Sequence, residues 1–338
     1  MANVRTAGTE SRLDLPLLDA LRILASVAVV RHHMRVDYLF GVGFGLPLFL
    51  VVMFGLAASS SKPETFGQFT RRKASYLLVP WLRWSAIYVV VLAAVDVAKG
   101  LSPWHRFEGD MIFYGGNPFL WFLPFAAAAL FPLRALQGVA ARWSPIRATV
   151  VASAVAAVAT AAVAWALTFR MPDFPVRAWL RVSPAIFWGL ALAQSTRARD
   201  DGQRALLLAG VALLAILTGA LSPFGGPPED LPRRFAFAIP IACVGFGWRL
   251  AVPDVVRRVA TATFGIYLVH PLIGKILGTV FDVFSWPAWL HTALVWCLAL
   301  ASVWALRALG VRWHELFTGR VSNPDATGPE LAVEKRAA

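Results

Sequence analysis

The sequence contains little charge. Charged residues make up 15% of its 338 residues and hydrophobic residues make up 58%, whereas soluble domains are about 25% charged and about 45–50% apolar. This shortage argues against a soluble domain and for an integral membrane protein with one polytopic domain. The 14 Trp and 23 Phe residues suit lipid contact and the aromatic belts at membrane interfaces.

Cysteine is also scarce. The two cysteines, Cys243 and Cys297, lie inside apolar runs, so we expect small buried hydrophobic side chains rather than a disulfide or a nucleophile. The first dozen residues are polar, and no short apolar region with a small-residue cleavage site follows them. We therefore expect no cleaved signal peptide and a retained first helix.

Acidic residues are outnumbered. Asp and Glu total 19 against 32 Lys and Arg, which gives a net charge of +13. The basic residues form short clusters between apolar runs, as in the cytoplasmic loops of membrane proteins. No DNA- or RNA-reading motif accompanies them, so we expect no nucleic-acid partner.

The apolar runs set the predicted fold class. A membrane helix needs about 20 mostly apolar residues, and the runs predict an all-α polytopic membrane protein with about ten transmembrane helices, nine or eleven being the alternatives. The distribution of Lys and Arg places both termini in the cytoplasm. We expect a transmembrane domain over 1–310 and a polar, disordered cytoplasmic tail over 311–338. The expected helices cover residues 15–36, 41–58, 76–95, 118–133, 148–169, 178–195, 205–221, 234–250, 259–281 and 288–309.

The first apolar run contains ionisable residues. The stretch LDALRILASVAVVRHH places Asp19 one turn before Arg22 and His33 three turns after it. On a helix, Arg22 and His33 lie on one face, about 16 Å apart along the axis, whereas His32 points about 100° away. Charged groups in membrane helices usually face a protein interior or an aqueous cavity, so we expect a polar pocket here. The alternative is an ordinary helix whose two ends reach the membrane interfaces.

A basic cluster precedes the third apolar run. The stretch FTRRKASYLLVP places Arg71, Arg72 and Lys73 before Pro80. Arginine clusters suit phosphate through bidentate, charge-assisted hydrogen bonds. The general excess of basic residues in cytoplasmic loops explains this cluster equally well.

Two later stretches combine aromatic and polar side chains. LWFL at residues 120–123 contains Trp121, either an interfacial anchor or part of a site. FGIYLVHP at residues 264–271 places Tyr267 and His270 on one helix face, and Pro271 is able to kink that helix. A histidine within a membrane helix is a functional candidate, with a structural hydrogen bond as the alternative.

Together, these four stretches resemble the acyltransferase family 3 membrane proteins, which O-acylate glycans and other acceptors. The first matches the family pattern of D-x-L-R, ten residues and H. The others match its basic cluster before a proline, its LWFL-like stretch and its F-G-I-Y-L-x-H-P stretch, in the family's order and over nearly the whole chain. Relatives commonly have a further Arg near the proline, whereas this sequence reads ASYLL there and Arg83 follows Pro80.

The resemblance implies an integral O-acyltransferase in the inner (plasma) membrane of a bacterium. Such an enzyme would transfer an acyl group, acetyl being favoured, from cytoplasmic acyl-CoA to a hydroxyl of a glycan or lipid-linked sugar on the extracytoplasmic side. Membrane lipids would surround it, and no metal is implied.

The resemblance and the residue chemistry together suggest roles for individual side chains. We expect His33 to be the general base, because a neutral imidazole with an ordinary pKa of about 6.5 suits proton abstraction; an acyl-imidazole intermediate is the less favoured variant. Asp19 and Arg22 complete the predicted catalytic set. Arg22 would also bind the CoA phosphates, together with Arg71, Arg72 and Lys73. The predicted acceptor-binding residues are Trp121, Tyr267, His270 and Arg83.

The main rival is a transporter or flippase of a lipid-linked or polar substrate. Such a protein would also have about ten helices with charges inside the membrane, and many have inverted repeats with broken helices. The sequence contains no evident repeat, and transport does not explain the four stretches.

Overall fold

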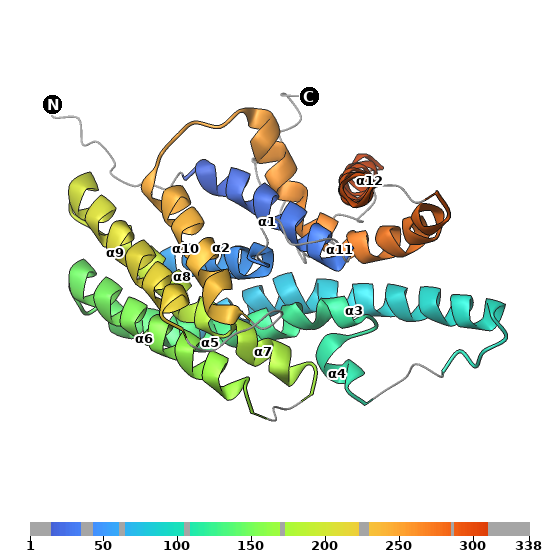
Figure 1. Cartoon of the computed structure of the whole chain (residues 1–338), viewed down its shortest axis with the longest axis horizontal. Helices are drawn as coiled ribbons and strands as arrows, with labels where there is room; N and C mark the ends of the chain where they lie inside the picture. Colours follow the sequence, from blue (N-terminus) through green and yellow to red (C-terminus); the bar gives the residue numbers. More distant parts are fainter. Residues whose placement is uncertain are drawn as a thin grey trace, which may run out of the picture.

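The computed structural model describes residues 15–34, 43–60, 65–104, 109–169, 173–222, 230–284 and 287–309, and the regular elements in these segments are all helices (Figure 1). They are α1 (Leu17–His33), α2 (Gly45–Ser59), α3 (Phe66–Ala98), α4 (Met111–Tyr114), the 3-10 turn η2 (Pro118–Trp121), α5 (Phe122–Ala140), α6 (Pro145–Ala166), α7 (Val176–Val182), α8 (Pro184–Ser195), α9 (Asp201–Ala220), α10 (Leu231–Gly247), α11 (Asp254–Phe284) and α12 (Ala288–Ala308).

Several helices begin at side chains that cap them. At the start of α3, the Thr65 hydroxyl accepts a hydrogen bond from the Gln68 N–H, and the Gln68 side chain accepts one from the Thr65 N–H. Ser144 and Asp200 cap α6 and α9 in a similar way. A cap of this kind typically contributes about 1 kcal/mol, so these helix starts are encoded locally.

One expected helix, 178–195, is two helices in the structure. α7 ends at Val182, and Pro184 begins α8. Proline has no N–H and fixes φ, so it disrupts a helix interior but suits a first turn. A single apolar run therefore supplies a short α7 and a buried α8, which is too short to cross a bilayer alone.

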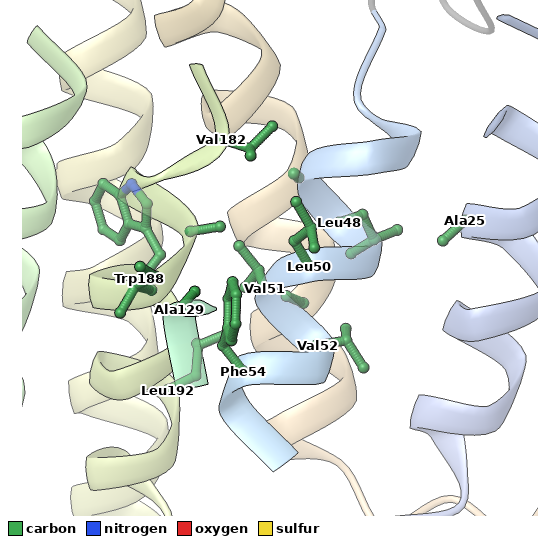
Figure 2. Close-up of a cluster of buried hydrophobic side chains, with 14 of the residues drawn as sticks. Ala25, Leu48, Leu50, Val51, Val52, Phe54, Ala129, Val182, Trp188 and Leu192 are labelled. Carbon is green, nitrogen blue, oxygen red and sulfur yellow. The ribbon is translucent and has the colours of Figure 1, made fainter. Parts of the chain in front are cut away.

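The core lies around α2, whose sequence is apolar on every side. In Figure 2, Val51 and Phe54 lie toward Trp188 and Leu192 of α8, whereas Val52 extends from the opposite side of α2. A helix that is hydrophobic all round belongs in a protein interior. α2 accordingly packs against α1, α8 and α10.

Two glycines allow α2 to approach its neighbours closely. A Cβ at Gly189 of α8 would lie 2.7 Å from the Phe54 Cβ, and a Cβ at Gly45 would lie 2.7 Å from the Ala28 Cβ of α1. Small residues at helix contacts serve this purpose in membrane proteins. The contact at Gly45 matters for function, because it fixes α2 beside the C-terminal half of α1.

The helices fit a multi-pass membrane protein. Within the described residues, six are long and apolar enough to cross a membrane: α3, η2 with α5, α6, α9, residues 254–278 of α11, and α12. α2 is apolar but shorter, with 15 residues, and α1 and α10, with 17 residues each, are also below this length. The all-helical membrane class is thus supported, while the count of about ten spans and the cytoplasmic termini stay predictions. The tail at 311–338 lies outside the described residues.

The cysteines behave differently from each other. Cys243 of α10 is buried, as expected, but the prediction for Cys297 is wrong, because its side chain is exposed on α12. α12 presents much of its surface outward, since only part of one face packs against α1 and α11. An apolar sequence context therefore did not distinguish the protein interior from the lipid-facing side.

Candidate active site

Two histidines from distant parts of the sequence meet inside the protein. His33 lies in the last turn of α1 and His270 lies within α11, and their Nδ1 and Nε2 atoms are 2.7 Å apart. The imidazole rings are nearly parallel, with centroids 5.0 Å apart. His270 is fully buried. The structure therefore joins two residues that the sequence predicted as separate site candidates.

The hydrogen bonds of His270 determine the tautomer of a neutral pair. His270 Nδ1 lies 3.2 Å from the carbonyl oxygen of Ile266. A carbonyl oxygen only accepts, so Nδ1 carries the hydrogen and His270 Nε2 is the acceptor. His33 Nδ1 then donates to His270, and the other nitrogen of His33, Nε2, keeps its lone pair. This arrangement is that of an oriented general base.

Proline and tyrosine shape the backbone around His270. Pro271 has no N–H for the carbonyl of Tyr267, one turn earlier in α11. The Tyr267 hydroxyl donates to the Phe119 carbonyl over 2.6 Å, and the Tyr88 hydroxyl donates to the Leu268 carbonyl over 2.9 Å. These bonds tie α11 to η2 and to α3, and hold His270 at a fixed depth.

Aromatic rings surround the histidine pair. The centroid of Phe119 lies 4.3 Å from that of His33, and the centroid of Tyr267 lies 5.6 Å from that of His270. Phe122 in turn packs edge-on against Tyr267. Rotation of either imidazole would disturb this packing, so the pair is held by apolar contacts as well as by hydrogen bonds.

His33 also lines a cavity of about 250 Å³ between α1, the start of α2, α7, α10 and α11. Among the predicted acceptor-binding residues, Trp121 and Tyr267 line it. His32 lines it too, although it points about 100° away from His33 on an ideal helix. A concave site with apolar walls and a few converging polar groups is the usual form of a small-molecule site.

The predicted donor-binding residues lie away from this cavity. Arg22 Nη1 donates to Asp19 Oδ1 over 3.2 Å, in an ion pair at the other end of α1 whose side chains are 32% and 28% exposed. Arg71, Arg72 and Lys73 lie near the start of α3, where Lys73 is 5.8 Å from the centre of the Phe69 ring. Neither this cluster nor Arg83 lines the cavity. Their predicted roles stay predictions.

Sequence reasoning missed three groups at the site. Arg181 of α7 and Arg234 of α10 line the cavity, and Phe119 contacts His33. The signal for Arg181 was present, because it lies inside an expected span, where a charge usually faces a cavity. Arg234 is the first residue of the expected helix 234–250, where a basic side chain is ordinary because it can reach the membrane interface. Nothing in the sequence distinguished Phe119 from other aromatic residues.

The fold and site define a class: a polytopic helical membrane protein in which the buried His270 and the half-buried His33 form an imidazole pair beside a cavity. The family model described as an acyltransferase domain matches residues 15–308. The chain therefore belongs to acyltransferase family 3, as its motifs predicted. No curated protein and no solved structure matches it.

Proposed function

We propose that this membrane acyltransferase moves an acyl group, acetyl being favoured, from acyl-CoA to a hydroxyl of a glycan or lipid-linked sugar. The donor would enter from the cytoplasm, where Arg22 and the cluster of Arg71, Arg72 and Lys73 would bind its phosphates. The observation that best supports the proposal is the 2.7 Å contact between His33 Nδ1 and His270 Nε2. Together with the contact between His270 Nδ1 and the Ile266 carbonyl, it favours the tautomer in which His33 Nε2 is unprotonated.

In this mechanism, His33 Nε2 takes the proton of the acceptor hydroxyl as its oxygen attacks the thioester carbon. The carbon–sulfur bond breaks, and the CoA thiolate leaves with the proton that His33 returns. His33 is then neutral again, with its Nδ1–H still donating to His270. His270 acts as a positioning residue, because it orients the base without contacting either substrate.

The location of the base supports transfer across the length of α1. Arg22 and His33 are separated by about 16 Å along the helix, which suits a donor held by its phosphates at one end with its thioester at the other. The acceptor would occupy the cavity that His33, Trp121 and Tyr267 line. Donor and acceptor would thus approach His33 from opposite directions.

The test uses purified protein in lipid nanodiscs with radiolabelled acetyl-CoA and a glycan and glycolipid extract. We expect acceptor-dependent CoA release and label in the acceptor. His33→Ala should lower turnover by roughly 10²–10⁴-fold, the usual contribution of a general base, with unchanged expression and thermal stability. His291→Ala, which removes a histidine of α12 that does not line the cavity, is the matched control and should retain most activity.

Two results would count against the proposal. Near-normal turnover in His33→Ala would remove His33 as the base. No CoA release by the wild-type protein, with any extract, would mean that acyl-CoA is not the donor.

A further inference from the structure

A second pocket lies between α11 and α12, away from the histidine pair. Its volume is about 500 Å³, and it is lined by Arg257, Arg258, Thr261, Trp304 and Arg307. Thr261 precedes the site histidine of α11 by nine residues, which corresponds to about 14 Å along the helix. None of the five residues lines the cavity beside that histidine pair, and none has a role in the proposed mechanism.

Arg307 of α12 is held in this pocket by α11. Its Nη1 donates to the Thr261 hydroxyl over 2.9 Å, and its Nη2 donates to the Thr261 carbonyl over 2.7 Å. A guanidinium group has five N–H donors, so these two bonds leave the others for a ligand. The side chain is oriented before a ligand arrives, which lowers the entropic cost of binding.

The pocket has more positive than negative charge around it. Arg257 Nη2 lies 3.3 Å from Asp254 Oδ1, in a pair whose side chains are 53% and 80% exposed. Within the part of the chain that the structure describes, no carboxylate forms an ion pair with Arg258 or Arg307. Three arginines therefore face one acid, and an exposed pair of this kind contributes little. Such a cluster suits a phosphate group, through charge-assisted hydrogen bonds.

An apolar stripe on α12 begins at the same pocket. Ala301 and Cys297 precede Trp304 by three and seven residues, so the three side chains lie on one helix face. All three are exposed. A tryptophan between a basic group and an apolar surface is typical of a membrane interface. A soluble phosphate would contact only the arginines, whereas a phospholipid would also place an acyl chain along this stripe.

We propose that the pocket between α11 and α12 is a binding site for an anionic phospholipid. The phosphate of the headgroup contacts Arg258 and Arg307, and an acyl chain lies along the stripe of Trp304, Ala301 and Cys297. Basic pockets between membrane helices bind lipid headgroups in this way. The site is separate from the proposed acyl transfer, and no step of that reaction is needed to test it.

The experiment measures equilibrium binding to the full-length protein in a neutral detergent. The probes are phosphatidylglycerol and phosphatidylcholine with the same acyl chains and the same fluorescent label, so that they differ in headgroup charge. We expect phosphatidylglycerol to bind about ten- to thirtyfold more tightly, because each of two arginines without an acidic partner contributes about fivefold. Inorganic phosphate and coenzyme A are added as soluble competitors, and neither should displace the bound phosphatidylglycerol.

Variants assign the preference to its residues. Arg258→Gln with Arg307→Gln should abolish the preference for phosphatidylglycerol. Arg258→Lys with Arg307→Lys should keep part of it, which distinguishes lost charge from misfolding. The matched control is Arg142→Gln with Arg199→Gln, which removes the same charge from two exposed positions outside the pocket. This control should keep the full preference.

Four results would overturn the proposal. Equal affinity for the two lipids would mean that the pocket does not recognise an anionic headgroup. A preference that survives in the double Gln variant, or that is lost equally in the control, would place lipid recognition elsewhere. Displacement by coenzyme A would assign the arginines to the acyl donor instead, and displacement by inorganic phosphate would show that the apolar stripe adds nothing to binding.

Discussion

The two ends of α1 contain ionisable side chains that are stabilised in different ways. At one end, Asp19 and Arg22 form a local ion pair, one turn apart and about one-third exposed. At the other, His33 contacts His270, 237 positions away, and the ring of Phe119. The first arrangement needs only the helix, whereas the second needs α1, η2 and α11 to be assembled.

This contrast separates the residues that would recruit a substrate from the residues that would take part in the reaction. A partly exposed arginine with a local partner can exchange that partner for a phosphate at little cost, because such pairs contribute only about 0–1 kcal/mol. An imidazole pair held by several elements keeps its geometry, and catalysis benefits from groups that are already oriented. We expect substitutions at the two ends to affect different kinetic parameters.

After the loss of His33 itself, the largest effect is expected at His270. His270→Ala removes the acceptor of the His33 Nδ1–H and should lower kcat by about a hundredfold, because a hydrogen bond that orients or stabilises a charged group is worth about 1.5–3 kcal/mol. His270→Gln, whose amide oxygen is able to accept the same hydrogen, should recover part of the activity. Acetyl-CoA turnover at saturating donor measures both.

The control for this prediction is the pH profile. In His270→Ala, the apparent pKa that governs kcat should move, since the partner of the base has changed. A variant with reduced kcat but an unaltered profile, and no recovery with Gln, would make the role of His270 purely structural.

The next largest effect is expected from a steric change near the His33 end of α1. A Cβ at Gly45 would lie 2.7 Å from the Ala28 Cβ and 2.9 Å from the Val29 backbone nitrogen, so Gly45→Ala has to push α2 away from α1. We expect a loss of stability of about 1–3 kcal/mol, typical of overpacking, together with reduced activity, because Gly45 lines the cavity. Thermal unfolding in nanodiscs measures the loss of stability.

Gly210 of α9 supplies the matched substitution. Nothing lies within 4 Å of a Cβ built there, so Gly210→Ala should be neutral or stabilising by up to about 1 kcal/mol through helix propensity. Equal effects of the two substitutions would show that the contact between α1 and α2 does not constrain the site.

The smallest effect is expected at the ion-paired end. Arg22→Ala should raise the KM for acetyl-CoA by about tenfold, because one charge-assisted contact to phosphate is lost, with little change in kcat or in thermal stability. Asp19→Asn keeps the arginine and should change the KM less. An unchanged KM in Arg22→Ala would remove Arg22 from the donor site and leave the role of His33 intact.

The sequence predicted the features that depend on neighbours within a few turns. Expected runs at 205–221 and 288–309 correspond to α9 and α12, because length and hydropathy decide whether a segment is a membrane helix. The pairing of Asp19 with Arg22 followed from their spacing on one helix. The family was evident from four short motifs, each of which is read within its own segment.

Only the tertiary structure decided which motifs meet. No periodicity in the sequence relates His33 to His270, and the tautomer of His33 depends on the Ile266 carbonyl of another helix. Likewise, Arg181 of α7 and Arg234 of α10 line one cavity although they are far apart in the sequence. Local rules fix helices and near pairs because a helix is stabilised by contacts within a few residues, whereas an active site is formed by packing between helices that the sequence pattern of each one does not specify.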